Sequence, residues 1–518
     1  MKWSPDGWPE KLMGVAGTPK LRFYDLDFRF GKPVKYETIS IDYNGSYIVS
    51  ASLIWDINHP KETNHMDSLP AVTVLERSQV SPPPATVGRK SLPLTFLDFF
   101  WLTFPDPVHT LFFYELPITK THFTQTIVPN LKQSLSTTLQ YFFPFVGKLA
   151  IFPTTTRKPE IRYVEGDSVT VTFAECNLDF NDLTGNHPRM CDKFYHLIPL
   201  LGRTAKAHDC ITIPVFSVQV TLFPNYGISI GMTNQHILGD ASTRFCFLKA
   251  WTSIAKSGSD ESFLANGTLP IYDRLINYPK LDESYLKYAK IEKFNEEYQI
   301  PRLSGPTDKV RATFVLTRTL INRLKKLVST RLPTLAYVSS FTVAFAYICN
   351  CVANLHNDDK KILFGFPVDC RLRVDPPIPN AYFGNCVMPF MTLTRTSILK
   401  GKEGFLTAAR LIGDDLHKML TNKEEIMKDL GPTENWFPDG FPEKIMGVAG
   451  TPKLKFYDLD FGFGKPRKHE TISIDYSGSI SISACRESNE DLEIGVCLSA
   501  TEMDVFAGYF NTGLETYI

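Results

Sequence analysis

The sequence has no excess of charge of either sign. Lysine and arginine together number 55, aspartate and glutamate also number 55, and the formal net charge at pH 7 is zero. No basic stripe with interleaved aromatic residues is present, so we expect no nucleic acid partner. With 43% hydrophobic and 21% charged residues, the composition is typical of a globular chain with ample core.

The sequence also lacks cysteine pairs with the spacing of a metal site or a disulfide framework. Its ten cysteines include no C-x-x-C pair, which indicates reduced thiols and no bound metal.

Targeting and membrane segments are missing as well. No apolar leader follows Met1, and the C-terminal Thr516-Tyr517-Ile518 matches no retention signal. The one long apolar run, 335–355, contains Ser339 and Asn350 among other polar residues, so it predicts a buried helix rather than a membrane span. We therefore expect a cytoplasmic protein without membrane contact.

One block of the sequence occurs twice. Residues 3–52 reappear at 436–485 with about three-quarters of the positions identical. Each copy carries a short signature, Asp27-Phe28-Arg29-Phe30-Gly31 or Asp460-Phe461-Gly462-Phe463-Gly464, followed by an Ile-Ser-Ile-Asp-Tyr segment that predicts a strand. A true domain repeat duplicates a whole folding unit, whereas this block is only a tail segment.

A second possible start lies at Met66, which opens a long globular stretch. We therefore interpret residues 1–65 as the trailing piece of a sister protein, without a domain of its own, joined to a complete protein at 66–518. The latter exceeds what one hydrophobic core usually supports, so two domains are expected. Residues 257–307 are polar and punctuated by glycine and proline, which predicts a long connection between the two.

Hydrophobic patterns predict strands and helices mixed in both halves, and therefore α/β layers. The expected helices lie at 130–142, 241–254, 320–329, 335–355 and 404–420. The expected strands lie at 72–80, 161–165, 169–173, 211–223, 228–235, 311–316, 362–367, 454–457, 471–475 and 492–498. Between 211–223 and 228–235 we expect a hairpin turn in which Gly227 takes a positive φ angle.

A candidate site lies where strand 228–235 passes into helix 241–254. His236 comes first, Gly239 permits a sharp turn, and Asp240 caps the helix. A neutral imidazole at this position can remove a proton from a hydroxyl that attacks an acyl carbon. The alternative is a satisfied core histidine followed by an ordinary cap.

Other catalytic motifs are missing. The sequence has no G-x-S-x-G, no H-E-x-x-H, no P-loop and no G-x-G-x-x-G after a strand, so hydrolase, metalloprotease, kinase and dinucleotide functions lack their parts. A histidine without a nucleophile or a metal favours direct group transfer.

With these motifs the chain resembles the plant BAHD acyl-CoA-dependent acyltransferases over essentially all of 66–518. His236-Ile237-Leu238-Gly239-Asp240 fits the H-x-x-x-D motif of that family. Asp460-Phe461-Gly462-Phe463-Gly464 fits its D-F-G-W-G motif, with Phe463 in place of tryptophan.

Three further segments look like the anthocyanin and phenolic-glucoside acyltransferase branch, whose members often use malonyl-CoA. They are Val368-Asp369-Cys370-Arg371, Asp375-Pro376-Pro377 and Tyr382-Phe383-Gly384-Asn385-Cys386.

The resemblance implies two chloramphenicol-acetyltransferase-like α/β domains with mixed sheets, 66–256 and 308–518. The crossover linker 257–307 joins them, and an active-site channel lies at their interface. His236 would act as general base on a hydroxyl of a small phenolic glycoside, and an acyl-CoA would be the co-substrate. No bound cofactor is implied, and we expect a monomer.

The resemblance also assigns roles to other residues. Asp240 would point away from the acyl group and pair with an arginine, which we place at Arg371. Asp460, Gly462 and Gly464 would be structural, near the side where CoA enters. Gly462 is informative, because the first copy carries Arg29 at the equivalent position, and an arginine could not follow a backbone that needed a positive φ.

The resemblance implies a malonyl or a hydroxycinnamoyl group as the acyl group, and one residue bears on the choice. Arg244 lies one helical turn beyond Asp240, where it can receive a malonyl carboxylate or remain an ordinary solvated arginine. A different class of function is a non-catalytic relic, in which residues 3–52 compete with 436–485 for one docking groove. It also stays open whether residues 1–65 belong to the real protein.

Overall fold

The structure is a computed structural model that describes most of the chain. The described residues are 33–43, 46–55, 71–104, 106–155, 157–295, 298–300, 305, 308–336, 338–421 and 442–517. The chain divides into two compact units, Met1–Pro70 and Ala71–Ile518.

The described part of the first unit is one hairpin. Strands β1 (Pro33–Tyr43) and β2 (Ser46–Trp55) pair antiparallel, with Ile41 opposite Ile48. The Ile-Ser-Ile-Asp-Tyr segment of the first copy is therefore a strand, as predicted. The signature that contains Arg29 lies outside the described residues.

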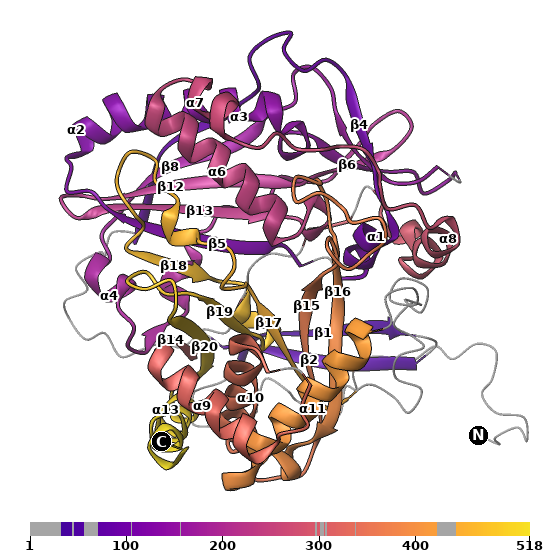
Figure 1. The fold of residues 1–518 in the computed structure, drawn as a ribbon. Coiled ribbons are helices and arrows are strands. Elements are labelled where there is room, and N and C mark those ends of the chain that lie inside the picture. Colours follow the sequence, from indigo (N-terminus) through magenta and orange to yellow (C-terminus); the bar gives the residue numbers. More distant parts are fainter. Residues whose placement is uncertain are drawn as a thin grey trace, which may run out of the picture. The chain divides into compact units, whose positions relative to one another are not determined.

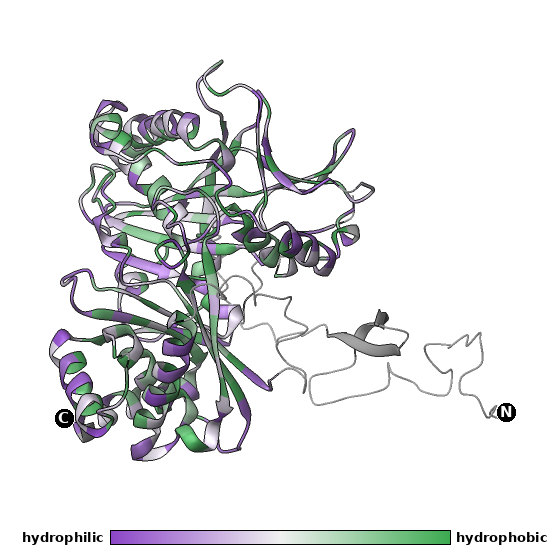
Figure 2. Cartoon of the chain, turned by 45° about the vertical axis from the view of Figure 1, so that its right-hand side comes forward, coloured by the Kyte–Doolittle hydropathy of each residue, from purple (hydrophilic) through white to green (hydrophobic). Residues whose placement is uncertain are grey.

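A six-stranded mixed sheet forms the centre of the first half of the second unit (Figure 1). In spatial order it contains β18 (Lys468–Thr471), β5 (Val108–Glu115), β13 (Gly227–Asn234), β12 (Phe216–Phe223), β8 (Val169–Cys176) and β3 (Val72–Val80). Every residue of β12 and β13 is buried. Side chains of helices α3 (Val128–Tyr141) and α6 (Ala241–Ser257) join those of the strands in one apolar core. Figure 2 shows hydrophobic residues along these strands, whereas the helices are partly hydrophilic.

A smaller five-stranded sheet lies in the same half. Its order is β10 (Ala205–Lys206), β11 (Ile211–Pro214), β6 (Lys148–Ile151), β7 (Glu160–Tyr163) and β4 (Lys90–Pro93). After β4 the chain enters helix α1 (Phe96–Thr103). Helix α8 (Pro279–Tyr288) packs on α1, since Asp282 accepts a hydrogen bond from the backbone N–H of Phe96 at 2.7 Å. Together with α7 (Glu261–Asn266), α8 gives the expected connection 257–307 helical structure of its own.

A seven-stranded mixed sheet forms the second half. Its order is β16 (Val387–Arg395), β15 (Lys361–Asp369), β17 (Lys444–Ala449), β19 (Ile480–Ala484), β20 (Leu492–Ser499), β14 (Lys309–Leu316) and β9 (Arg189–Met190). Four helices share its core, namely α9 (Arg318–Arg331), α10 (Ser340–Ala353), α11 (Gly401–Thr421) and α13 (Ala500–Tyr517). The apolar run at 335–355 forms the buried helix α10, as predicted. Among the helices that the structure describes, none has the length and the apolar character needed to span a membrane.

Each half lends one strand to the sheet of the other half. Strand β9, which comes from the first half of the sequence, pairs with β14 at the edge of the seven-stranded sheet, with Arg189 opposite Arg311. Strand β18, which comes from the second half, pairs with β5 at the edge of the six-stranded sheet, with Lys468 opposite Phe113. The two halves are thus interlocked and form one compact unit.

Buried charges hold this junction together. Glu470 on β18 accepts from Arg189 at 2.7 Å and from Arg311 at 3.0 Å, and Arg311 also pairs with Asp475 at 3.1 Å. All four side chains are at least 95% buried. Burial opposes ionisation of Glu470, but the two arginines outweigh it and lower the pKa of Glu470 to about 2.

Two expected strands near the C-terminus are wrong. Residues 454–457 form no strand, because Leu454 and Phe456 pack into the first core as part of a loop and a short 3-10 turn, η8 (Phe456–Asp458). The strand expected at 471–475 ends at Thr471, where its pairing with β5 ends, and helix α12 (Ile474–Ser477) follows. The same Ile-Ser-Ile-Asp-Tyr sequence is a strand in β1, so it does not fix its own conformation.

The hairpin between β12 and β13 also differs in its turn. The residue with positive φ is Asn225, at +66°, and not Gly227. Gly227 is needed for another reason, because a Cβ there would lie 2.2 Å from the backbone oxygen of Tyr114.

We expect Arg311→Met to destabilise the fold by about 3 to 5 kcal/mol, because it leaves the buried Asp475 without its arginine and Glu470 with only Arg189. Arg331→Met is the matched control, since Arg331 also pairs with a carboxylate, Glu403, but on the surface at 3.3 Å, where such pairs contribute about 0 to 1 kcal/mol. Urea unfolding followed by circular dichroism measures both. Equal losses for the two variants would contradict a structural role of the buried cluster.

Candidate active site

A cavity of about 1070 Å³ lies between the two halves of the second unit. His236, Asp240 and Arg244 line it from the first half, and Arg371 and Phe366 are among the residues that line it from the second. The cavity wall is largely apolar, with aromatic side chains that include Phe100 and Trp101 on α1 and Phe104 directly after it. A cavity is thus present where the active-site channel was expected.

The turn after β13 places His236 and Asp240. A 3-10 turn, η4 (His236–Leu238), is followed by Gly239 with φ of +152°. A Cβ on Gly239 would lie 2.6 Å from the side chain of Thr243, so only glycine allows α6 to begin this close. Asp240 caps α6 by accepting from the backbone N–H of Thr243 at 3.0 Å, as its position predicted.

Asp240 is bound to the second half. Arg371 donates to both of its carboxylate oxygens, at 2.8 and 3.2 Å, and the backbone N–H of Cys386 donates at 3.0 Å. Burial raises the pKa of a carboxyl group, but the charge and the hydrogen bonds of Arg371 hold the pKa of Asp240 below its usual value. The pairing expected between Asp240 and Arg371 is present, and Asp240 has no hydrogen bond to His236 in the described structure.

The backbone of His236 is also held from the other half. Asn385 donates its side-chain N–H to the carbonyl oxygen of His236 at 3.0 Å and to Asp98 at 2.9 Å. Asp98 lies on α1, where it forms a capping box with Thr95. Sequence reasoning missed Asp98, although the spacing Thr95-x-x-Asp98 before an apolar run was a usable helix-start signal.

The imidazole of His236 stacks on the indole of Trp101. The ring centroids are 3.4 Å apart and the planes differ by 11°. Nδ1 is enclosed and has no hydrogen-bond partner among the described residues. Enclosure, followed by the positive charge of Arg244, lowers the pKa of His236 to about 3, so the ring is neutral at pH 7 and can accept a proton. Sequence reasoning also missed Trp101, which belonged to an apolar run without a distinguishing pattern.

Arg244 faces the cavity and forms no ion pair with any residue that the structure describes. Its Nη1 is enclosed and has no hydrogen-bond partner in the described part of the chain. Burial lowers the pKa of Arg244 to about 10, an effect that the charge of Asp240 opposes, so the guanidinium stays charged at neutral pH. A buried cation of this kind can receive an anionic ligand through charge-assisted hydrogen bonds.

The Asp460–Gly464 signature lies apart from the residues that line the cavity. Asp460 accepts from the backbone N–H groups of Gly462 and Gly464, both at 2.8 Å, and from Lys256 at the end of α6 at 2.7 Å. Gly462 has φ of +98°, and Gly464 has φ of +86°. The loop thus closes on its own carboxylate and is attached to the helix that follows His236.

Aromatic residues of the same loop pack on the first core. Phe461 meets Trp251 edge to face at 4.9 Å, and Phe463, which replaces the tryptophan of the family motif, meets Tyr114 at 5.9 Å.

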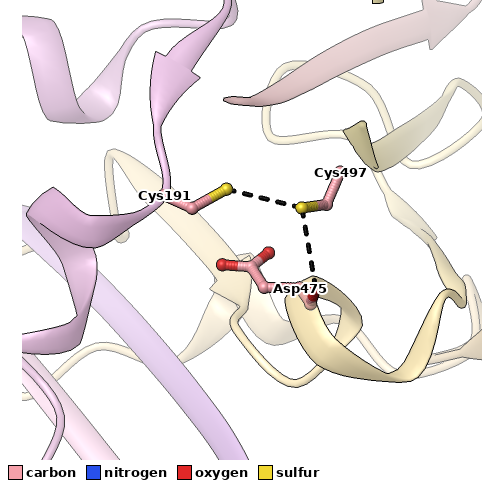
Figure 3. A group of neighbouring side chains, drawn as sticks. All are labelled: Cys191, Asp475 and Cys497. Atoms are coloured by element: carbon pink, nitrogen blue, oxygen red, sulfur yellow. Dashed lines mark hydrogen bonds between the residues drawn. The ribbon is translucent and has the colours of Figure 1, made fainter. Parts of the chain in front are cut away.

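A second cluster of reactive side chains lies at the junction of the halves (Figure 3). The Cys191 and Cys497 sulfurs are 3.4 Å apart, and Asp475 is next to them. Three such groups could in principle hold a cation. Arg311 already occupies both carboxylate oxygens of Asp475, and its charge opposes a metal ion, so we assign the cluster to packing.

Comparison with known proteins agrees with this geometry. Residues 70–512 match the model of the Transferase family. A malonyl-coenzyme A:anthocyanin 3-O-glucoside-6''-O-malonyltransferase from Dahlia pinnata is 53% identical over 88% of this chain and 100% of its own length. Phenolic glucoside malonyltransferase 1 from Nicotiana tabacum is 41% identical over 86% of this chain and 99% of its own length.

Solved structures support the same fold. Vinorine synthase superposes with a TM-score of 0.60 at 21% identity, covering 84% of this chain and 96% of its own. The F. sporotrichioides TRI101 structure complexed with coenzyme A and T-2 gives 0.53 at 14% identity, covering 80% and 96%.

The resemblance to the BAHD acyltransferases is therefore confirmed, as is the expected fold of two mixed α/β domains around an interface site. The chain belongs to the Transferase family and is an acyl-CoA-dependent acyltransferase.

Proposed function

We propose that this protein transfers a malonyl group from malonyl-CoA to a hydroxyl of an anthocyanin or phenolic glucoside. The observation that carries the choice of donor is Arg244, a cavity-facing guanidinium without a partner in the described structure. The Dahlia pinnata and Nicotiana tabacum relatives support the choice, since both are named as malonyltransferases of glucosides. A hydroxycinnamoyl donor has no carboxylate to place on Arg244.

His236 is the general base of this reaction. The acceptor O–H gives its proton to Nε2, because Nδ1 is enclosed, while its oxygen attacks the thioester carbonyl carbon. The tetrahedral intermediate then breaks its C–S bond, and the CoA thiolate takes the proton back from the imidazolium. Acyl transfer is direct, and this sequence of steps uses no acyl-enzyme and no bound cofactor.

Asp240 and Arg371 have a structural role in this scheme. Arg371, Cys386 and Thr243 donate to the carboxylate of Asp240, so it is not free to orient the His236 imidazole. We assign the Asp460, Gly462 and Gly464 loop to the same structural class, since it holds the end of α6 through Lys256.

The cavity suits an acyl-CoA arm and an aromatic glycoside together. Its volume of about 1070 Å³ lies slightly above the range of about 300 to 1,000 Å³ usual for small-molecule sites. The aromatic side chains of α1 can stack on a planar aglycone, while Asp369, Arg373 and Asn380 at the cavity wall can bind sugar hydroxyls.

We further propose that catalysis needs only residues 66–518, as domains 66–256 and 308–518 with the linker 257–307. The compact unit at Ala71–Ile518 and the family match at 70–512 support the separation of residues 1–65 from the rest of the chain. The proposed protein is a monomer and is located in the cytoplasm.

His236→Ala is expected to lower kcat by about a hundred- to ten-thousand-fold, because general-base assistance contributes about that much. The measurement is release of CoA thiol from malonyl-CoA in the presence of an anthocyanin 3-glucoside. His122→Ala, an exposed histidine on the short helix α2 (Lys120–His122), is the control and should keep full activity. Activity of His236→Ala within tenfold of the wild type would remove His236 from the chemistry.

Arg244→Ala is expected to reduce kcat/KM for malonyl-CoA at least tenfold and to leave kcat/KM for coumaroyl-CoA within a factor of about three, because only malonyl has a carboxylate to lose. The Arg244→Lys variant keeps the charge and should retain part of the preference. Competition between the two donors, with both products resolved by chromatography, measures the ratio directly. Equal losses for both donors would show that Arg244 acts on the fold and not on the donor.

Removal of residues 1–65 is expected to leave kcat and KM unchanged within a factor of two, because every residue assigned to the site lies in the second unit. Chain 66–518 and the full chain are assayed side by side at equal concentration. A large gain on truncation would instead favour the view that the duplicated segment competes with residues 436–485.

A further inference from the structure

The stacking of Trp101 on His236 joins two distant parts of the chain. Trp101 lies on α1, His236 lies in η4 after β13, and the two rings are nearly parallel with centroids 3.4 Å apart. Both residues line the cavity. The indole therefore covers one face of the imidazole at the place where the substrates must meet.

In the described structure, hydrogen bonding at Nδ1 does not set the orientation of the His236 ring. Its Nδ1 is enclosed without a partner, whereas the second ring nitrogen of a functional histidine is usually fixed by a carbonyl or a carboxylate. The nearest candidate, Asp240, is bound to Arg371, Cys386 and Thr243 instead. Packing must therefore set the orientation of the imidazole, and the stacked indole of Trp101 is the packing partner.

Trp101 is itself placed relative to the backbone of His236. The capping box of Thr95 and Asp98 fixes the start of α1. Asp98 accepts from the backbone N–H of Asn385 at 3.1 Å and from its side chain at 2.9 Å. The same Asn385 side chain donates to the His236 carbonyl at 3.0 Å, so one amide links the helix of Trp101 with the peptide of His236.

We propose that Trp101 is a positioning residue for acyl transfer, whose indole holds the His236 imidazole in the plane where Nε2 meets the acceptor hydroxyl. The proposal rests on the assignment of His236 as the general base. Stacking restricts the rotation of the imidazole but leaves its edge free, which is the geometry that proton transfer along the ring plane requires. A displacement of about 1 Å at a reacting group can cost about a hundred-fold in rate.

The steady-state experiment separates this role from simple contact with the acceptor. Trp101→Leu and Trp101→Met remove the aromatic ring, Trp101→Phe keeps one, and Phe104→Leu removes a cavity-lining aromatic residue of the same segment. We expect Trp101→Leu and Trp101→Met to lose at least tenfold in kcat with KM for malonyl-CoA within threefold. Trp101→Phe should recover most of the loss, and Phe104→Leu should act mainly on KM for the glucoside.

A second readout does not depend on turnover. Diethylpyrocarbonate modifies neutral imidazole, and peptide mass spectrometry gives the rate at His236 as a function of pH. Enclosure and the charge of Arg244 lower the pKa of His236 to about 3, against the opposing charge of Asp240, so the wild-type rate should stay flat from pH 7.5 to 5.5. Trp101→Leu admits water to the ring and raises this pKa toward its usual value of about 6.5, so its rate should fall as the pH drops. Trp101→Phe should resemble the wild type.

These outcomes decide the proposal. It is overturned if Trp101→Phe and Trp101→Leu lose the same activity, if the loss is confined to KM for the acceptor, or if both modification profiles stay flat. Wild-type protein that transfers no acyl group would instead count against the proposed function, and the modification profiles would still test the placement of the ring. Circular dichroism melting of each variant identifies any that fail to fold, and the Trp101→Phe profile remains informative in that case.

Discussion

The rest of the site depends on the buried ion pair between Asp240 and Arg371. Asp240 is the N-cap of α6 and Arg371 lies two residues beyond the end of β15, so the pair ties the helix of the first half to the sheet of the second. Both side chains are nearly inaccessible, at 3% and 1% exposure, and removal of one partner would leave a buried charge without compensation. His236 lies four residues before Asp240, and its position relative to the opposite wall is therefore set by an interaction that takes no part in proton transfer. In the proposed mechanism, this accounts for an H-x-x-x-D motif that is required as a whole although only its histidine takes the proton.

The exchange of strands also fixes the position of one half relative to the other. Strands β9 and β18 each complete the sheet of the other half. The side chains of Arg189, Arg311 and Glu470 are buried at the same junction. The halves therefore cannot hinge apart without breaking both backbone pairing and ion pairs. A cavity formed between two such halves keeps its shape, which suits a reaction that depends on placing a hydroxyl against a thioester. The hydrophobic cores contribute most of the stability, while the buried charges and the edge strands determine how the two halves are positioned relative to each other.

The sequence predicted what short-range patterns determine. Helices α3, α6 and α9 follow from their apolar spacing, and the cap at Asp240 follows from its position. The features that the sequence did not predict depend on contacts between residues far apart in the chain. Glu-Thr-Ile-Ser-Ile-Asp-Tyr is a strand in β1 but turns into α12 near Arg311, because there Asp475 reaches a buried guanidinium. The contact of Trp101 with His236 could not be predicted for a related reason. An apolar run does not indicate which of its rings will contact a histidine more than a hundred residues away in the chain.

The charges around His236 also connect the choice of donor with the strength of the base. In the free protein, the unpartnered Arg244 adds to the enclosure that lowers the pKa of His236, which keeps the imidazole neutral but makes it a weak base. A malonyl carboxylate bound to Arg244 would neutralise that positive charge and raise the pKa of His236, so the ring would become more basic when the correct donor is in place. A donor without a carboxylate would leave the Arg244 guanidinium without a partner and the pKa of His236 low, so it would bind less well and react more slowly. One arginine would then discriminate between donors twice, once in binding and once in the proton transfer.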